Sequence, residues 1–170
     1  LTWNPSPAWR WEAAGVFATF DNGFDEFALD NNGRTTFSDQ PGRDYQRSKA
    51  VSLRGTFSGS PGVRFTTVTS GTWTNSIYSY DDDWTAASYA GFSDLRRDRR
   101  VWNEELRLDS AVTHGAFGWA DRWTLGAFFN ETKETSVYTN TNPWDLTGLR
   151  TRYHAQNEAL FGQVGHNFNA

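Results

Sequence analysis

Apolar and polar residues alternate along several stretches of the chain, most clearly between Val101 and Asn130. One alternate set in this region is largely apolar and consists of Trp102, Glu104, Leu106, Leu108, Trp123, Leu125, Ala127 and Phe129. A period of two is typical of β-strands whose two faces meet different surroundings. The small and polar residues from Ser110 to Asp121 can reverse the chain. The pattern therefore predicts an antiparallel hairpin with one apolar and one charged face.

The same period predicts five further strands. They are Leu1–Asn4, Trp9–Phe20, Ser48–Phe57, Val63–Thr74 and His154–Asn169. Pro5 and Pro7 follow the first strand, and we expect it to end there because proline cannot donate a hydrogen bond to a neighbouring strand. Together with the hairpin, the pattern predicts an all-β antiparallel meander of about seven strands.

The predicted connections alternate in length along the chain. Three are short: Asn4–Ala8, Ser58–Gly62 and Ser110–Asp121. Three are long and polar: Asp21–Arg47, Asn75–Arg100 and Glu131–Tyr153. Long loops on one side and short turns on the other are typical of outer-membrane barrels, whose strands cross the membrane with about 9–11 residues. Aromatic residues near the ends of the apolar sets match the interfacial girdles of such barrels. These residues are Trp9, Trp11, Trp73, Trp102 and Trp123.

Composition narrows the class of protein. The chain has no cysteine, which excludes disulfides and thiolate metal sites, and 16% of its residues are aromatic, which favours β-structure. Its net charge of −4 argues against a nucleic-acid partner. The mean hydropathy of −0.70 is compatible with a barrel, in which only alternate residues face lipid. The chain has no methionine and opens in a strand-like pattern at Leu1, so we expect a piece of a longer protein.

Four stretches resemble the β-barrel domain of TonB-dependent outer-membrane receptors. They are F-T-T-V-T-S-G-T-W from Phe65 with the aspartates that follow, N-E-E-L-R-L-D-S from Asn103, W-T-L-G-A-F-F from Trp123, and E-A-L-F-G-Q-V-G-H-N-F from Glu158. The resemblance implies that residues 1–170 are a segment, about seven strands of about 22, of a large transmembrane barrel. It also implies a plug domain that this chain does not contain.

The same resemblance implies a function and a location for the parent protein. It would lie in the outer membrane of a Gram-negative bacterium and actively import a scarce nutrient, such as a siderophore or other metal chelate, a vitamin or a glycan. Its implied partners are outer-membrane lipid and lipopolysaccharide, the plug domain and TonB, and the nutrient. No nucleic acid, cofactor or enzymatic activity is expected, and no catalytic motif occurs in the sequence.

Charged residues on the presumed inner faces of the strands are candidates for contact with a plug or solute. They are Glu105, Arg107, Arg54 and Arg64. The alternative is a structural ladder of ion pairs across the strands that also includes Glu12. Glu104 interrupts the apolar set and is expected near a membrane interface, unless the register slips there.

Three further groups of polar residues each allow two interpretations. Asp81, Asp82 and Asp83 could bind a divalent cation or form a solvated acidic loop. The run from Arg96 to Arg100 contains four arginines, which could bind lipopolysaccharide phosphates or form a solvated charge run. His114, His154 and His166 lack the spacing of metal ligands, so no metal site is predicted.

Aromatic residues in the predicted loops could stack on a nutrient or pack within the loops. The candidates for ligand contact are Trp84, Trp144, Tyr80 and Tyr138.

A soluble extracellular β-sandwich that binds carbohydrate through exposed Trp and Tyr is the alternative function. The two proteins differ in where the apolar set lies. A barrel exposes the set on its outside, whereas a sandwich buries it between two sheets. The set consists of Trp11, Phe17, Leu53, Phe65, Leu106, Leu125 and Phe129.

Overall fold

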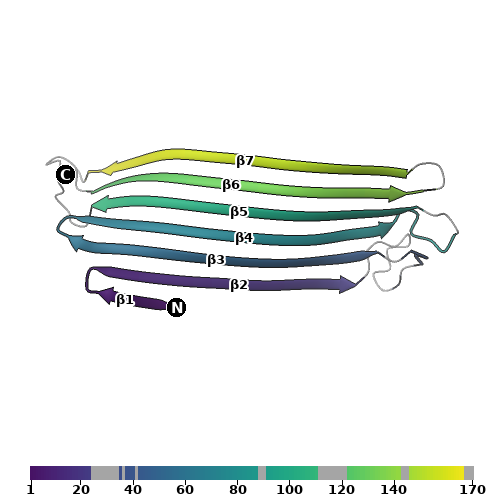
Figure 1. Cartoon of the computed structure of the whole chain (residues 1–170), viewed down its shortest axis with the longest axis horizontal. Coiled ribbons are helices and arrows are strands. Elements are labelled where there is room, and N and C mark those ends of the chain that lie inside the picture. Colours follow the sequence, from purple (N-terminus) through teal and green to yellow (C-terminus); the bar gives the residue numbers. More distant parts are fainter. Residues whose placement is uncertain are drawn as a thin grey trace.

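The computed structural model of the chain is a single open sheet of seven antiparallel strands (Figure 1). It describes residues 1–23, 35, 37–40, 42–87, 91–110, 122–142 and 146–166. The strands are β1 (Thr2–Ser6), β2 (Trp9–Gly23), β3 (Arg43–Ser60), β4 (Val63–Asp81), β5 (Phe92–Ser110), β6 (Arg122–Thr141) and β7 (Leu146–Gly165). Each strand pairs with its neighbours in chain order, and the described residues form no helix. The predicted all-β meander is confirmed.

The register between the long strands is continuous except near two strand ends, where it shifts between Asp21 and Gly23 of β2 and between Phe57 and Ser60 of β3. β4 and β5 pair without a shift from Val63 opposite Ser110 to Asp81 opposite Phe92. β6 and β7 pair in the same way from Arg122 opposite Gly165. Because successive side chains alternate between the faces, an unbroken register keeps each set of side chains on one face across the sheet.

The strands are longer than the hydrophobic pattern predicts. Most of Asn75–Arg100 and Glu131–Tyr153 belongs to strands, so the prediction of long loops there is wrong. Only residues 82–91 connect β4 to β5, and only residues 142–145 connect β6 to β7. Beyond Trp73 and Trp102 both faces of the sheet are polar, so the alternation of hydrophobicity disappears. Backbone pairing continues there, because it does not depend on apolar side chains.

Two tight turns join the strands at the opposite end of the sheet. Pro61 and Gly62 connect β3 to β4, and Gly62 has a φ of 82°, as the third residue of a type II turn requires. Pro7 and Ala8 connect β1 to β2. Pro5 does not end β1, contrary to prediction. It lies within this edge strand, where the register with β2 shifts. The predicted turn Ser110–Asp121 falls almost entirely outside the described residues.

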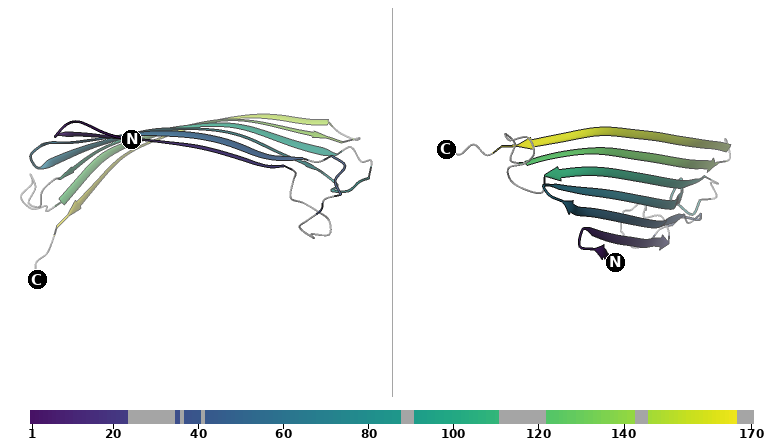
Figure 2. Two further views of the ribbon diagram at one scale, coloured as in Figure 1. Left: turned by 90° about the horizontal axis from the view of Figure 1, so that it is seen from below. Right: turned by 60° about the vertical axis from the view of Figure 1, so that its left-hand side comes forward.

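The sheet has no conventional hydrophobic core. Figure 2 shows one layer that bows along its strands, and the described residues place no second layer on either face. The largest fully buried side chains among them are those of Asp81 and Ser93, both polar. Since a stable apolar face must be covered by something, the surroundings of the sheet decide what each face can do.

Candidate functional site

The continuous register sorts the side chains of β2–β7 into two chemically different faces. The face that we call the banded face carries the odd-numbered residues of β2, β3, β4 and β6 and the even-numbered residues of β5 and β7. One cross-strand row on it reads Trp11, Gly55, Thr67, Leu106, Ala127 and Leu160. The opposite face, which we call the polar face, carries Glu12, Arg54, Val68, Glu105, Phe128 and Ala159 in the next row.

The banded face carries an apolar band over the half of the sheet nearest the tight turns. Its side chains are well exposed: Leu125 is 53% exposed, Leu53 44% and Leu106 43%. No described element of the chain covers them. This band contains the whole apolar set on which the two predicted functions differ.

Two tryptophan rings of the band lie close to glycines. A Cβ atom added at Gly55 would lie 2.6 Å from the Trp11 ring on the neighbouring strand. A Cβ added at Gly71 would lie 2.7 Å from the Trp73 ring. Trp11 also stacks on Trp9, with ring centroids 5.5 Å apart. A side chain added at Gly55 or Gly71 would therefore displace the indole ring that occupies its space.

The upper edge of the band, away from the tight turns, is inclined to the strands. From β2 to β7, the last apolar residue before the polar part is Phe17, Val51, Trp73, Trp102, Phe129 and Leu160. Phe17 shares a cross-strand row with His154 of β7, but the edge in β7 lies at Leu160, six positions nearer the tight turns. This displacement, all of which falls between β4 and β7, is about 20 Å along the strand across about 24 Å of sheet width, an average incline of about 40°.

The incline also sets the height of the band. In β4 the band runs from Val63 to Trp73, which is about 33 Å of strand. Projected along the normal to the inclined edge, this length is about 25 Å. The band therefore crosses the strands obliquely and is tallest in β4, since in β3 it runs only from Val51 to Phe57.

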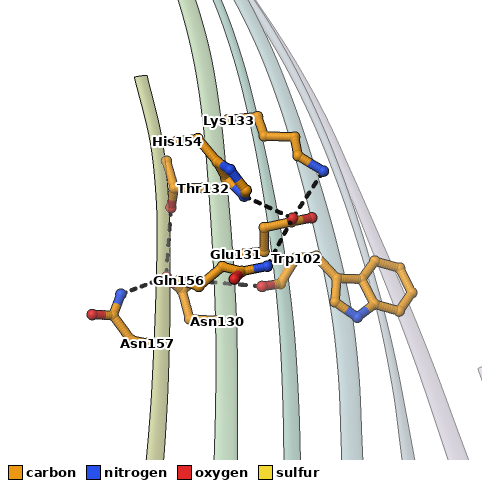
Figure 3. Close-up of polar contacts among 8 residues, drawn as sticks. All are labelled: Trp102, Asn130, Glu131, Thr132, Lys133, His154, Gln156 and Asn157. Carbon is orange, nitrogen blue, oxygen red and sulfur yellow. Dashed lines mark hydrogen bonds and ion pairs between the residues drawn. The ribbon is translucent and has the colours of Figure 1, made fainter. Parts of the chain in front are cut away.

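A polar cluster around Glu131 lies just beyond the edge of the band (Figure 3). Glu131 Oε1 accepts a hydrogen bond from Lys133 Nζ at 2.8 Å and from Gln156 Nε2 at 3.3 Å, and it lies 2.9 Å from His154 Nε2. The hydrogen bonds from Lys133 and His154 hold the pKa of Glu131 below its ordinary value. The change from Phe129 to this cluster within two residues marks a sharp boundary between apolar and polar surroundings.

A ladder of amides crosses the polar face. Asn103 Nδ2 donates to Ser70 Oγ at 3.2 Å, Asn130 Nδ2 donates to Asn103 Oδ1 at 2.7 Å, and Asn157 Nδ2 donates to Asn130 Oδ1 at 3.2 Å. These four residues form one cross-strand row of β4–β7. Sequence reasoning missed the ladder, because its signal appears only when the strands are set in register.

The predicted charged candidates all lie on the polar face. Arg107 donates through Nε to Asp109 at 3.0 Å, and its Nη1 lies 3.8 Å from Glu105 Oε1. Arg54 and Arg64 form no ion pair with any described residue. Glu12 pairs with Arg10 of its own strand at 2.8 Å rather than with Arg54 opposite. The ion pairs on this part of the face therefore run along the strands instead of across them.

The predicted arginine run lies within β5 and is divided between the faces. Arg96 and Arg100 lie on the banded face, whereas Arg97 and Arg99 lie on the polar face. Arg99 Nε donates to Glu134 Oε2 at 2.6 Å, and Arg97 Nε lies 3.2 Å from Glu134 Oε1 as an ion pair. Burial raises the pKa of Glu134, but the hydrogen bonds from Arg99 and Ser136 outweigh it, so this pKa lies below its ordinary value.

The three aspartates after Tyr80 organise the connection between β4 and β5. Asp81 is fully buried and accepts hydrogen bonds from Ser38 and from the backbone of Asp83. Asp82 accepts from Ser93 at 2.8 Å and from Asn140 at 2.6 Å. The interpretation of a solvated acidic loop is therefore wrong for Asp81. The described residues contain no group of acidic, histidine or cysteine side chains that could hold a metal ion.

The aromatic candidates are divided between strands and connections. Tyr80 and Tyr138 lie on the polar faces of β4 and β6 rather than in loops, and Tyr138 Oη is 3.2 Å from Ser93 Oγ. Trp84 follows β4 with a φ of 54°. Trp144 lies outside the described residues, as does His114. Ser93 of β5 is the cross-strand partner of Tyr80 and the polar contact of Tyr138, so both tyrosines lie at the end of the polar face farthest from the tight turns.

Glu104 lies on the banded face, where its sequence pattern placed it. It accepts a hydrogen bond from Thr69 Oγ1 at 2.8 Å and lines a hollow of about 440 Å³ with Leu106, Phe129 and Glu158. The register does not slip at this position. Glu104 therefore interrupts the band next to its upper edge, as the first residue of β5 on this face after Trp102 in the direction of the tight turns.

Comparison with family models, with curated proteins and with solved structures finds no match to this chain. The part of the chain that the structure describes contains no helix long and apolar enough to cross a membrane. The geometry of the two faces is therefore the basis on which a function can be proposed.

Proposed function

We propose that this sheet is part of the wall of a transmembrane β-barrel in the outer membrane of a Gram-negative bacterium. The banded face meets lipid, and the polar face lines a water-filled interior. The observation that carries the proposal is the inclined band. Strands of such barrels tilt by about 35–45° and present an apolar strip about 25 Å tall. The average incline of about 40° agrees with the first value, and the height of about 25 Å in β4 agrees with the second.

The function that we propose for the whole barrel is active nutrient uptake by a TonB-dependent receptor. The nutrient is a scarce one, such as a siderophore or other metal chelate, a vitamin or a glycan. The four sequence stretches that resemble this family support the proposal, as do the long strands, which extend well beyond the band. The plug domain and TonB are the proposed partners of the parent protein, and lipid with lipopolysaccharide surrounds it. Nutrient uptake, measured in cells with and without TonB, tests the proposed receptor function. We expect uptake to stop when TonB is removed.

The alternative, a carbohydrate-binding β-sandwich, is less well supported. A sandwich needs a second sheet over the apolar face, and the described residues form a single layer. A sandwich sheet also alternates inward apolar and outward polar residues along its strands. Here the apolar strip crosses the strands obliquely and leaves about half of each long strand polar on both faces.

Single cysteines can test the orientation of the faces, because the chain has none of its own. Leu125→Cys and Thr124→Cys occupy adjacent positions of β6 on opposite faces, as do Leu53→Cys and Ser52→Cys in β3. Each variant of the full-length protein is reconstituted in lipid vesicles and carries a nitroxide label. We expect oxygen, which concentrates in lipid, to relax the label at Leu125 and Leu53. A water-soluble nickel chelate should relax the label at Thr124 and Ser52. Equal access of the chelate to both members of each pair would exclude the barrel.

A further inference from the structure

We propose that the banded face carries a binding site for the phosphates of lipopolysaccharide, centred on Arg100, Arg150 and Arg152. This inference rests on the proposed function, since it requires the banded face to meet lipid. Most of the lipid-facing surface of a barrel contacts lipid without selecting a headgroup, whereas this site would select phosphate groups.

Basic residues collect on the banded face between the edge of the band and the row of Arg43 and Asp94. This basic belt contains eight cationic residues: Arg43, Arg47, Lys49, Arg96, Arg100, Lys133, Arg150 and Arg152. It contains five acidic residues: Asp21, Asp94, Asp98, Glu131 and Glu158. The belt is thus net positive in a chain whose net charge is −4. The excess of positive charge is a property of this surface and not of the protein as a whole.

Several of these cations have no internal partner. Arg43, Arg96 and Lys133 pair with Asp21, Asp94 and Glu131. By contrast, Lys49, Arg100, Arg150 and Arg152 form no ion pair with any described residue. The carboxylate of Asp98 lies near Arg100 and Arg152 and accepts a hydrogen bond from Asn75 Nδ2 at 3.3 Å. Unpaired guanidinium groups so close to an apolar strip are suited to an external anion.

Two shallow hollows lie between these side chains. One, of about 530 Å³, is lined by Arg100, Arg150 and Arg152 together with Asp98, Lys133 and His154. The other, of about 510 Å³, is lined by Arg47, Lys49 and Arg100 together with Trp73. Arg100 belongs to both hollows. The cations therefore line two adjoining depressions and are not scattered over the surface.

The position of the belt indicates the occupant. It begins where the apolar band ends, at the level where lipid headgroups meet a barrel. It also lies at the end of the sheet with the connections 24–42, 82–91 and 142–145, which together are longer than the connections 7–8, 61–62 and 111–121 at the other end. Longer connections mark the extracellular side of such barrels. Arginine binds phosphate with two parallel hydrogen bonds. The lipid of that leaflet whose head carries phosphate groups is lipopolysaccharide.

The test uses the full-length protein in phosphatidylethanolamine vesicles that contain one of three probes. The probes are lipid A with both phosphates, lipid A with its phosphates removed, and phosphatidylglycerol. The protein is extracted in mild detergent, and the affinity for each retained lipid is measured by native mass spectrometry. We expect the wild type to retain phosphorylated lipid A over the other two. In the triple variant R100Q/R150Q/R152Q, the affinity should fall about fivefold for each lost cation.

The control variant R54Q/R64Q removes two unpaired arginines from the polar face. It should retain phosphorylated lipid A as the wild type does. Equal binding of both forms of lipid A, or equal binding by wild type and triple variant, would overturn the proposal. Equal binding of phosphatidylglycerol by the wild type would overturn the assignment to lipopolysaccharide. The spin labels separate these results from failure of the barrel itself: labels that show insertion, without phosphate selectivity, contradict only the lipid site.

Discussion

Thr124 and Leu125 are neighbours in β6 and meet opposite conditions. Thr124 Oγ1 donates a hydrogen bond to Asp109 at 2.8 Å, so its polar group is satisfied within the sheet. The side chain of Leu125 is 53% exposed and nothing in the described chain covers it. The same contrast holds over the half of the sheet nearest the tight turns. Many side chains of the polar face are paired laterally, through the amide ladder and ion pairs, whereas no described element covers the apolar side chains of the banded face. In the barrel that we propose, the polar face meets water and the banded face meets lipid.

A charge in the middle of the band should break this contrast most strongly. Arginine near the middle of a bilayer costs about 2–4 kcal/mol on the lipid face of a barrel. We expect Leu53→Arg to lower the free energy of unfolding by that amount, measured by urea titration in lipid vesicles. Ser52→Arg places the same side chain on the polar face of the same strand and should cost about 1 kcal/mol or less. Similar costs for the two variants would mean that the faces meet the same medium.

The glycines beneath the aromatic rings give the next largest effect. Gly55→Val should displace the Trp11 ring and cost about 1–3 kcal/mol, because the added side chain would overlap the indole. Gly15→Val is the matched control on the same face, since an added Cβ there meets only Ala50 O at 3.8 Å. Unfolding in urea measures the cost, and tryptophan fluorescence reports the displaced ring. Equal costs at both positions would show that the ring does not depend on Gly55.

The amide ladder should show a graded effect on the polar face. Asn130→Ala removes a donor to Asn103 and an acceptor for Asn157, so we expect a loss of about 1–3 kcal/mol. Asn157→Ala removes only the terminal hydrogen bond and should cost about 0.5–1.5 kcal/mol. The difference is measured by the same urea titration. A larger loss for Asn157→Ala than for Asn130→Ala would contradict a ladder centred on Asn130.

Acid should have the smallest effect, through Glu134. The folded protein holds the pKa of Glu134 below its ordinary value, so the carboxylate stabilises the fold at pH values above that ordinary value. This contribution is lost as the pH falls through the lowered pKa of the folded state. Glu134→Gln removes the titrating group, so its stability should depend less on pH between 7 and 3 in thermal melts. An unchanged pH dependence would mean that Arg97 and Arg99 do not act on this carboxylate.

The band and the faces could be predicted from the sequence, because a two-residue period in hydrophobicity is visible wherever one face is apolar. The upper strands could not be predicted in this way. In Glu131–Thr141 both faces are polar, so the residues carry no alternation, although Thr, Val and Tyr there favour strands.

The register-dependent parts of the site lie beyond sequence reasoning as well. Asn103, Asn130 and Asn157 are ordinary polar residues in sequence, and only cross-strand pairing makes them a ladder. The arginine run is visible as a cluster of charge, but its division between the faces follows from its position within β5. The burial of Asp81 depends on Ser38, which is 43 residues away along the chain.

The free edge of β7 has a consequence for biogenesis. From Leu146 to Gly165 this strand pairs only with β6 in the described sheet. Its other side therefore presents a long row of unpaired backbone donors and acceptors to any other strand. Such an edge is a template for intermolecular pairing and aggregation. A chain of these 170 residues in water should therefore self-associate through β7, whereas in the barrel proposed above a neighbouring strand would cover this edge.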